Sequence, residues 1–336
     1  MAWYDKKGKD KDMILSSRIR FARNLSDYPF ASRMDDTSAK EIIEKIETAL
    51  DGSLKKKDLS GMSPLEARSL AERHIISPEF AEKKTPHALF CDDKEEIFLM
   101  ACEEDHIRLQ CILPGYDLDA AYKKACKYDD KLESALKIAY DSELGYLTHC
   151  PTNLGTGMRA SVMMFLPALT QAKKIDSLAS SLAKLGLTIR GMFGEGSEGS
   201  GTLYQISNQI TLGISEEETI NKLEDVISQI CTLESKQRDF IKDNYYDYMD
   251  DKANRAEGAL KYAKMMSSGE FMKLYSDIRL GISFGMIKDI TTETLDTLLI
   301  EILPATLCTS AFAKKPPENE SERDKLRAEY IKKALS

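Results

Sequence analysis

Five arginines in four short segments of the chain have the chemistry to bind an anionic ligand. Arg18 and Arg20 lie two residues apart in a strand-like stretch, and residues two apart on a strand share one face. The other three are Arg108, Arg159 and Arg190. The guanidinium group is a planar fork that can bind phosphate oxygens through two hydrogen bonds. Taken alone, each arginine is more simply explained by a surface salt bridge.

Carboxylates cluster in two further places. Glu103-Glu104-Asp105 directly follows a predicted strand, and Glu195 and Glu198 lie in a glycine-rich segment. A carboxylate at a strand end and another on a loop could flank a cationic substrate, orient it and accept its proton. An ordinary acidic turn has the same composition, and the periodicity does not distinguish the two interpretations.

His149 and Cys150 begin an unusual segment rich in turn-forming residues. Neighbouring residues on a strand point to opposite faces, so His149 does not by itself activate Cys150 as a nucleophile. A thiol that acts electrostatically, beside backbone donors and arginines, fits equally well. His74 and His106 have no His or Cys partner at metal-ligand spacing. We therefore expect no metal-binding cluster, and the residues alone favour structural roles for both histidines.

A glycine-rich segment invites comparison with nucleotide-binding loops. Residues 194–199 match Gly-x-Gly-x-x-Gly, and five of the 18 glycines fall between 191 and 201. A dinucleotide-binding loop must open a helix, whereas the residues from Leu203 onward continue as a strand. The P-loop pattern Gly-x-x-x-x-Gly-Lys-Ser/Thr does not occur. If the chain binds a nucleotide, its arginines must neutralise the phosphates.

The composition is that of a globular protein of about two domains. Over 336 residues, 47 Lys+Arg and 55 Asp+Glu give a net charge of −8, which argues against non-specific nucleic-acid binding. The longest apolar stretch, 162–169, is too short to span a membrane. The seven cysteines lack paired spacing, and charged residues follow the N-terminus closely. We expect reduced thiols, no secretion signal and a cytoplasmic location.

Hydrophobic periodicity predicts an α+β fold in which an antiparallel sheet is flanked by helices. Helical spacing marks 36–50 and 117–140. Short apolar runs predict consecutive strands within 86–113 and two more strands at 189–193 and 203–212.

The C-terminal third has helical spacing throughout. It begins with one helix predicted over 215–244, and the composition then changes at Tyr245-Tyr246-Asp247. We place a domain boundary near residue 250. It divides the chain into a catalytic domain, 1–250, and a C-terminal all-helical domain, 251–336.

The segment 150–161, Cys-Pro-Thr-Asn-Leu-Gly-Thr-Gly-Met-Arg-Ala-Ser, resembles the active-site motif of the phosphagen (guanidino) kinases. Four other segments resemble further blocks of that family in the same order: 16–20, 103–108, 190–195 and 204–208. The resemblance implies phosphoryl transfer from ATP to a guanidino group, on an antiparallel sheet flanked by helices. Mg²⁺ accompanies ATP in this chemistry.

Within that family, the chain is most similar to the bacterial protein arginine kinases. The first block begins at Ser16, which leaves no room for the helical N-terminal domain of creatine kinases and small-arginine kinases, and extra helices follow the last block. Residues 323–328, Arg-Asp-Lys-Leu-Arg-Ala, are similar to the phosphoarginine-sensing motif of the protein arginine kinases. The similarity runs over 13–328. One departure is Cys102, where the family has Asn, and it puts a local hydrogen bond in doubt.

The resemblance implies roles for individual residues. Glu104 would be the base or orienting carboxylate, Glu195 would hold the guanidinium, and Cys150 would tune it electrostatically. The implied nucleotide-binding residues are Ser17, Arg18, Ile19, Arg20, Phe21, His74, Arg108, Arg159, Ala160, Ser161, Val162, Met163, Arg190, Gly191, Met192, Phe193 and Gly194. The implied phosphoarginine-sensing residues are Arg323, Asp324, Arg327 and Ala328.

The resemblance also implies partners. These are protein substrates with exposed arginines, a zinc-binding activator protein, a Clp-type protease and a second copy of the chain, joined through the C-terminal helices. Phosphorylation would mark proteins for proteolysis or alter a stress-response repressor. A kinase for free arginine is the first alternative, and a catalytically dead phosphoarginine-binding adaptor is the second. The intact Glu104, Glu195 and arginines argue against the adaptor.

Overall fold

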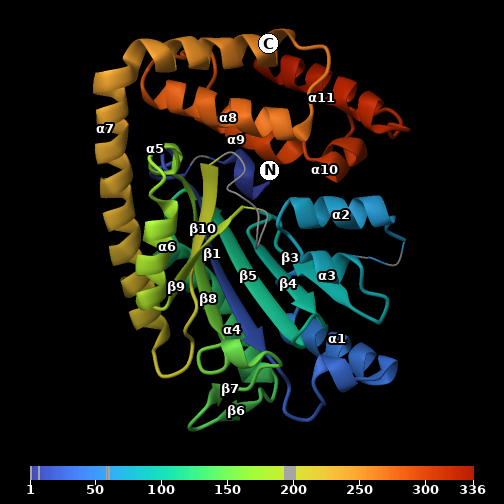
Figure 1. Cartoon of the computed structure of the whole chain (residues 1–336). Coiled ribbons are helices and arrows are strands. Elements are labelled where there is room, and N and C mark those ends of the chain that lie inside the picture. The colour runs from blue at the N-terminus through green and yellow to red at the C-terminus, as the bar shows by residue number, and fades with distance from the viewer. Residues whose placement is uncertain (1, 7, 58, 60, 193–201) are drawn as a thin grey trace.

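An eight-stranded antiparallel sheet is the centre of the larger part of the molecule (Figure 1), as the sequence predicted. The computed structural model describes residues 2–6, 8–57, 59, 61–192 and 202–336. The strand order is β2-β3-β4-β5-β1-β8-β10-β9. The strands are β1 (Ile14–Arg23), β2 (Lys55–Lys57), β3 (Ala88–Cys91), β4 (Ile97–Ala101), β5 (Ile107–Pro114), β8 (Met158–Phe165), β9 (Leu187–Gly191) and β10 (Leu203–Asn208). A separate hairpin pairs β6 (Tyr140–Asp141) with β7 (Gly145–Tyr146).

One face of the sheet is covered by long helices. These are α1 (Asp36–Leu50), α4 (Leu118–Ala135), α6 (Ile175–Lys184) and the first half of α7 (Glu216–Tyr262). The apolar residues that recur at helical spacing, such as Ile42 of α1 and Leu223 of α7, are fully buried against the sheet. α1 begins where the sequence predicted, because the Asp35 side chain accepts a hydrogen bond from the Ser38 N–H at 2.8 Å.

β1 sends alternate side chains to the two faces of the sheet. Ile19 points into the core under α4, whereas Arg18 and Arg20 point to the opposite face. At the start of the strand, the pairing with β8 shifts by one residue between Ile14 and Ser16, which is a β-bulge. Because of this extra residue, Ile14 packs into the same core as Ile19, and Leu15 packs into the opposite one.

α7 links the two parts of the molecule. The sequence predicted separate helices on either side of residue 250, but the chain stays helical over Glu216–Tyr262 and only kinks, at Tyr245 (φ −136°, ψ 25°). Before the kink, Leu223 packs into the core of the sheet, and after it Leu260 packs into the C-terminal helices. A kinked helix satisfies its backbone hydrogen bonds without a loop, which is why the change in composition gave no break.

The C-terminal helices share a core with the N-terminal end of the chain. They are α8 (Ser268–Ser283), α9 (Thr292–Glu301), α10 (Pro304–Thr309) and α11 (Glu320–Leu335). Their apolar cluster includes Trp3 and Tyr4 of the short helix η1 (Trp3–Asp5) and Phe165 of β8. In the part of the chain that the structure describes, no helix is both long and apolar enough to cross a membrane.

The face of the sheet opposite α4 is only partly covered. The remaining α-helices of the described chain are α2 (Pro64–Glu72), α3 (Pro78–Ala81) and the short helix α5 (Pro167–Gln171). α2 and α3 enclose a small apolar cluster with β3 and β4, built from residues such as Leu70, Phe80 and Leu89. Farther along this face, Leu15 and Phe165 pack against the C-terminal helices. Between the two apolar clusters the face carries polar and charged side chains, and it holds the candidate site.

Candidate active site

The register of the sheet brings the predicted arginines onto one face. Arg20 of β1 pairs with Arg159 of β8, and next to it Arg18 pairs with Ser161. On β5, Arg108 pairs with Ala22 of β1, and directly paired residues of an antiparallel sheet point to the same side. On β9, Arg190 pairs with Gln205, whose side chain accepts a hydrogen bond from Arg18 at 2.7 Å. All five arginines therefore face one surface, although they come from four strands.

A cavity of about 1040 Å³ lies over this surface. Arg18, Arg20, His74, Arg108 and Met192 are among the residues that line it, and α2 and α3 form its outer wall. Cavities that hold small molecules have volumes of ~300–1,000 Å³. The size and the cationic lining of this cavity suit a nucleotide.

The arginines in the cavity are crowded by like charges. Burial, with Arg108 and Arg159 nearby, lowers the pKa of Arg18 to about 9. Burial and the same neighbours lower the pKa of Arg20 well below its ordinary value. The Nε atom of Arg20 is buried and has no hydrogen-bond partner among the described residues. An anionic ligand would supply both the missing charge and the missing acceptor.

His74 lies at the edge of the same cavity. Its backbone is in the left-handed region, with φ +59°, which is uncommon for a residue other than glycine. Burial, with Arg18 and Arg20 nearby, lowers the pKa of His74 to about 4, so the ring is neutral at physiological pH. Its Nε2 atom is buried and has no partner in the described part of the chain. A neutral imidazole can donate or accept a hydrogen bond to a ligand in the cavity.

Glu103 holds Arg108 in place at the end of β5. Its Oε1 accepts hydrogen bonds from Arg108 Nη1 at 2.7 Å and from Ser77 Oγ at 2.6 Å. Burial raises the pKa of Glu103, but Arg108, Ser77 and the backbone N–H of Glu104 outweigh it and lower this pKa. Glu103 thus stays ionised and orients the guanidinium of Arg108.

Glu104 is the exposed neighbour of Glu103. It lines a second cavity of about 610 Å³ together with Phe80, Lys83 and Arg108. Burial of part of the carboxyl group, with Asp105 and Glu103 close by, raises the pKa of Glu104 above its ordinary value. A carboxylate with a raised pKa is a better proton acceptor. Glu104 can therefore act on a cationic group that approaches the arginine-lined cavity.

Asp105 connects the Glu104 segment to the Cys150 segment. Its Oδ1 accepts hydrogen bonds from the backbone N–H of His149 at 2.7 Å and from Asn24 Nδ2 at 2.6 Å. Cys150 follows directly, and its Sγ lies 3.0 Å from Thr152 Oγ1. The backbone just before Cys150 is thus tied to a buried carboxylate that is next to Glu104 in the sequence.

Cys102, the departure from the family pattern, has a left-handed backbone with φ +61°. Asn adopts this conformation more readily than Cys does. The buried thiol points toward the Ala39 carbonyl oxygen, at 3.7 Å, and burial raises its pKa to about 12. The backbone N–H of Cys102 still bonds the His106 carbonyl oxygen at 2.8 Å, so the turn that carries Glu104 is intact.

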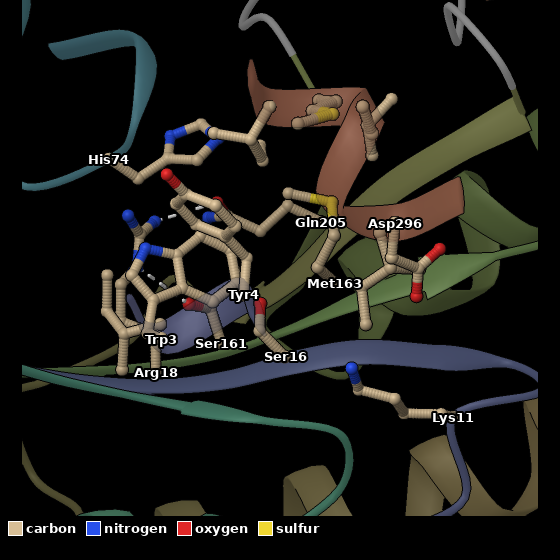
Figure 2. Close-up of a pocket in the computed structure, with 15 residues that line it drawn as sticks. Trp3, Tyr4, Lys11, Ser16, Arg18, His74, Ser161, Met163, Gln205 and Asp296 are labelled. Atoms are coloured by element: carbon tan, nitrogen blue, oxygen red, sulfur yellow. Dashed lines mark hydrogen bonds between the residues drawn. The ribbon is translucent and has the colours of Figure 1, made fainter. Parts of the chain in front are cut away.

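A third, small cavity of about 30 Å³ adjoins the arginine surface (Figure 2). Arg18, His74, Ser161, Met163 and Gln205 are among the residues that line it. Trp3 and Tyr4 of η1 lie beside Arg18 and Ser161, and Asp296 of α9 lies across the cavity from them. The C-terminal helices therefore reach the residues predicted to bind a nucleotide.

The predicted site residues do not all point into the cavity. Side chains of five of them face the opposite core or its loops, so only their backbone is available to a ligand: Ser17, Ile19, Phe21, Ala160 and Val162. Gly191 and Met192 end β9 at the cavity. Phe193, Gly194 and Glu195 lie outside the described residues. His106 has the structural role that the residues favoured, since its Nδ1 accepts from the Leu25 N–H at 3.0 Å.

The sequence interpretation missed several residues of the site. Gln110 lies on the cavity face of β5, where it pairs with Arg20, and Gln205 bonds Arg18. Alternation along β5 from Arg108 could have identified Gln110. Glu103 and Asp105 were noted only as members of an acidic cluster, because their partners Ser77, Asn24 and His149 are distant in sequence.

The predicted phosphoarginine-sensing residues lie on α11. Arg327 is almost fully buried, and it donates hydrogen bonds to the carbonyl oxygens of Ile302 at 2.9 Å and Met266 at 2.7 Å. It also forms an ion pair with Asp324. Ala328 is buried. Arg323 is partly exposed, and its guanidinium lies 3.8 Å from Glu320.

No cluster of three or more His, Cys, Asp or Glu side chains that could hold a metal ion occurs among the residues placed by the structure. The arginine-lined cavity, with the glutamate pair at its edge, is therefore the best-defined polar site of the described chain.

Comparison with known proteins identifies the class and then the family. The fold is that of the guanidino kinases: a taurocyamine kinase from Schistosoma mansoni with bound transition state analog components superposes with a TM-score of 0.61, at 28% identity over 67% of this chain and 33% of that duplicated chain. A lombricine kinase gives a TM-score of 0.61 at 25% identity over 67% of each chain. Residues 37–237 match the model "ATP:guanido phosphotransferase, C-terminal catalytic domain". The chain belongs to this ATP:guanido phosphotransferase family.

Curated relatives are similar over nearly the full length. The chain is 43% identical to the protein-arginine kinase of Caldanaerobacter subterraneus, over 97% of this chain and 98% of the relative. It is 41% identical to that of Pelotomaculum thermopropionicum, over 99% of this chain and 95% of the relative. Residues 246–336 match the model "Protein-arginine kinase McsB C-terminal domain". The family predicted from the sequence is thereby confirmed.

Proposed function

We propose that this protein transfers the γ-phosphoryl group of ATP to the guanidinium group of arginine side chains in proteins. The observation that carries the proposal is that the sheet register turns five arginines to one surface, where Arg18, Arg20 and Arg108 line a cavity and Arg108 also lines the neighbouring cavity of Glu104. The protein-arginine kinase relatives and the matching C-terminal model favour protein arginines over free arginine as the acceptor.

The arginines hold the phosphates of ATP. Arg18 and Arg20 carry buried positive charge, and Arg20 Nε and His74 Nε2 are buried without partners in the described chain, so the cavity fits an anion rich in acceptor oxygens. Mg²⁺ bound to the phosphates neutralises further charge when ATP is present. The ion would enter bound to the phosphates of the nucleotide, as Mg²⁺ commonly does in ATP-dependent enzymes. Fixed arginine charges stabilise the transferring phosphoryl group without having to reorganise.

Glu104 prepares the acceptor. A guanidinium nitrogen is a poor nucleophile while its lone pair is delocalised over a group with a pKa above ~12. One nitrogen attacks the γ-phosphorus, the bond to the bridging oxygen of ADP breaks, and the nitrogen loses a proton to the Glu104 carboxylate. By resemblance, Glu195 holds the other guanidinium nitrogens, and the Cys150 thiol tunes the charge of the group. Alignment by these side chains replaces a random encounter with a fixed in-line geometry.

The C-terminal helices add regulation and partners to this proposal. By resemblance, Arg323, Asp324, Arg327 and Ala328 form a phosphoarginine-sensing pocket. Arg327 is already held by Ile302, Met266 and Asp324, so Arg323 is the more accessible cation of the four. The protein would work in the cytoplasm as a homodimer, with a zinc-binding activator and a Clp-type protease as partners.

The test offers two acceptors at once. The protein is mixed with Mg-ATP, free arginine and an unfolded arginine-containing protein, and acid-labile phosphate is located by mass spectrometry without acid. We expect phosphate on protein arginines, and a Glu104→Gln variant should lose transfer by about 10²–10⁴-fold while still binding ATP. Label on free arginine alone would contradict the proposed acceptor. Absence of transfer to either acceptor would contradict the proposed reaction.

A further inference from the structure

α2 connects the C-terminal helices to the nucleotide cavity. Arg68, Ala71 and Glu72 of α2 line the large cavity, and His74 follows two residues after its last residue. The end of α2 also packs against α10. Glu72 therefore lies between a C-terminal helix and a residue of the candidate nucleotide site.

The Glu72 carboxylate caps the N-terminus of α10. Its Oε1 accepts a hydrogen bond from the Ala305 N–H at 3.0 Å, and its Oε2 accepts from the Thr306 N–H at 2.8 Å and from Thr306 Oγ1 at 2.9 Å. α10 begins at Pro304, and the side chain at its own N-cap position, Leu303, supplies no hydrogen bond. Free N–H groups and the helix dipole favour a carboxylate at this position. The cap that α10 lacks locally is thus provided by α2.

The two residues that follow Glu72 are also fixed by other elements. The Arg73 carbonyl oxygen accepts a hydrogen bond from Trp3 Nε1 at 3.0 Å, and the His74 carbonyl oxygen accepts one from Gln110 Nε2 at 3.0 Å. Trp3 also lies beside His74, with ring centroids 6.4 Å apart. The left-handed backbone of His74 is unfavourable for a residue other than glycine, so it persists only where the surroundings enforce it. Glu72 is the first of three consecutive anchors.

The other end of this connection is on α11. Arg327 Nε donates a hydrogen bond to the Ile302 carbonyl oxygen at 2.9 Å, three residues before Ala305. The segment from Ile302 to Thr306 is thus held by Arg327 on one side and by Glu72 on the other. The backbone segment 302–306, with a hydrogen bond to α11 at one end and hydrogen bonds to α2 at the other, joins α11, α10 and α2.

We propose that Glu72 is a positioning residue for the nucleotide site: by capping α10 it fixes the end of α2 and holds His74 in the cavity. This inference rests on the proposed function, because it takes the cavity to be the ATP site. His74 presents an unpartnered Nε2 there, and a small rotation of the chain at residue 74 would turn this atom away from the ligand.

If Glu72 acted only through its negative charge, its neutralisation would change ATP binding in the opposite direction. The carboxylate lines a cavity that holds several arginines, so it repels an anionic ligand. If it did no more than that, its neutralisation would tighten the binding of ATP. If it positions His74, its neutralisation weakens the binding of ATP. The direction of the change therefore decides between the two roles.

The experiment uses the only tryptophan of the chain, Trp3, as a reporter beside His74. ATP is titrated into the full-length protein while Trp3 fluorescence is followed, and KM for ATP and kcat are measured on an unfolded protein acceptor. For Glu72→Gln we expect Kd and KM for ATP to rise about 5–10-fold while kcat changes less than about twofold. Thr306→Val removes one bond to Glu72 and keeps the charge, so it should shift KM in the same direction by less.

Glu234→Gln is the matched control. Glu234 of α7 caps α5 in the same manner, accepting from the Ala168 N–H at 3.0 Å and the Leu169 N–H at 2.9 Å, and it does not line the nucleotide cavity. We expect this variant to lower thermal stability and to leave KM for ATP unchanged. An equal rise in KM for Glu234→Gln would mean that lost capping acts only through general destabilisation, which overturns the inference.

The remaining outcomes separate this inference from the proposed function. Tighter or unchanged ATP binding by folded Glu72→Gln, with an active wild type, overturns the positioning role alone. If Glu72→Gln does not fold, an unchanged KM in Thr306→Val overturns that role. A wild type that neither binds ATP nor transfers phosphate overturns the proposed function and this inference together.

Discussion

Arg20 and Arg23 lie three residues apart on β1, yet their surroundings differ completely. Arg23 points into the core, where its Nη2 lies 2.6 Å from Asp129 Oδ2 and 3.6 Å from Glu216 Oε1. Its guanidinium also lies over the ring of Tyr146, at 3.5 Å from the centroid. Arg20 points to the cavity, and it forms no ion pair within the described part of the chain. One face of the strand neutralises its arginine, and the other does not.

The difference separates stability from function. A buried arginine that is surrounded by carboxylates holds elements together: Arg23 joins β1 to α4 through Asp129 and to α7 through Glu216. An arginine that is crowded by other arginines is held at an electrostatic cost, and an anion in the cavity would offset that cost. The lowered pKa values of Arg18, Arg20 and His74 all arise on this second face.

Removal of Arg23 should have the largest effect, on stability. Arg23→Gln leaves the buried Asp129 and the partly buried Glu216 without their counter-ion, and breaking a buried pair costs about 3–5 kcal/mol. We expect the free energy of unfolding, from urea titration, to fall by this amount. A second substitution, Asp129→Asn, should restore part of the loss because it removes the stranded charge. Unchanged stability of Arg23→Gln would show that the two faces do not differ as described.

Removal of Arg20 should affect activity instead. Arg20→Gln removes a charge from the cavity that we propose to bind ATP, and loss of a group that stabilises the transferring phosphoryl group costs about 10²–10³-fold in turnover. Because the substitution also relieves repulsion from Arg18 and Arg159, we expect the melting temperature without nucleotide to stay constant or to rise. ATP should stabilise the wild type more than the variant. A large drop in the melting temperature would place Arg20 with the structural arginines.

The pH dependence of stability should show a smaller effect of the cavity face. His74 has a pKa of about 4 in the folded protein, against ~6.5 in an unfolded chain, so the unfolded state binds its proton first as the pH falls. The contribution of neutral His74 to the free energy of unfolding is fully present above pH ~6.5. As the pH falls from there toward 4, the free energy of unfolding should decrease by on the order of 2–3 kcal/mol. Urea titrations between pH 7 and 4 should show a flatter profile for His74→Gln. Parallel profiles would mean that His74 titrates normally.

The sequence predicted the sheet and the cavity face because both depend on local alternation. The two-residue spacing of Arg18 and Arg20 was enough to place them together, and the same rule puts Arg23 on the other face. Long-range pairing was not predictable in this way. The carboxylates that neutralise Arg23 lie about a hundred residues or more away along the chain, at Asp129 and Glu216, and nothing in the pattern around them indicates an arginine partner.

The contacts between the two parts of the molecule were the least predictable feature. Glu72 caps a helix that begins more than two hundred residues later, and Pro304 offers no sequence signal that its cap is supplied from elsewhere. The kink in α7 at Tyr245 coincides with a change in composition, which suggested a boundary but not a continuous helix. The family resemblance supplied the expected roles of His74 and Glu104. The local pattern had favoured a structural role for His74 and had not distinguished Glu104 from an ordinary acidic turn.

The bulge at the start of β1 also bears on how this chain can change by mutation. Side chains alternate along a strand. A residue inserted or deleted between Arg18 and Arg20 would therefore send Arg20 and Arg23 to the opposite face of the sheet. The bulge between Ile14 and Ser16 already accommodates one such extra residue, upstream of Arg18. Length changes in the N-terminal segment can therefore be absorbed at that point. A length change between Arg18 and Arg20 would instead exchange the two faces for the later arginines, placing Arg23 in the cavity and Arg20 in the core.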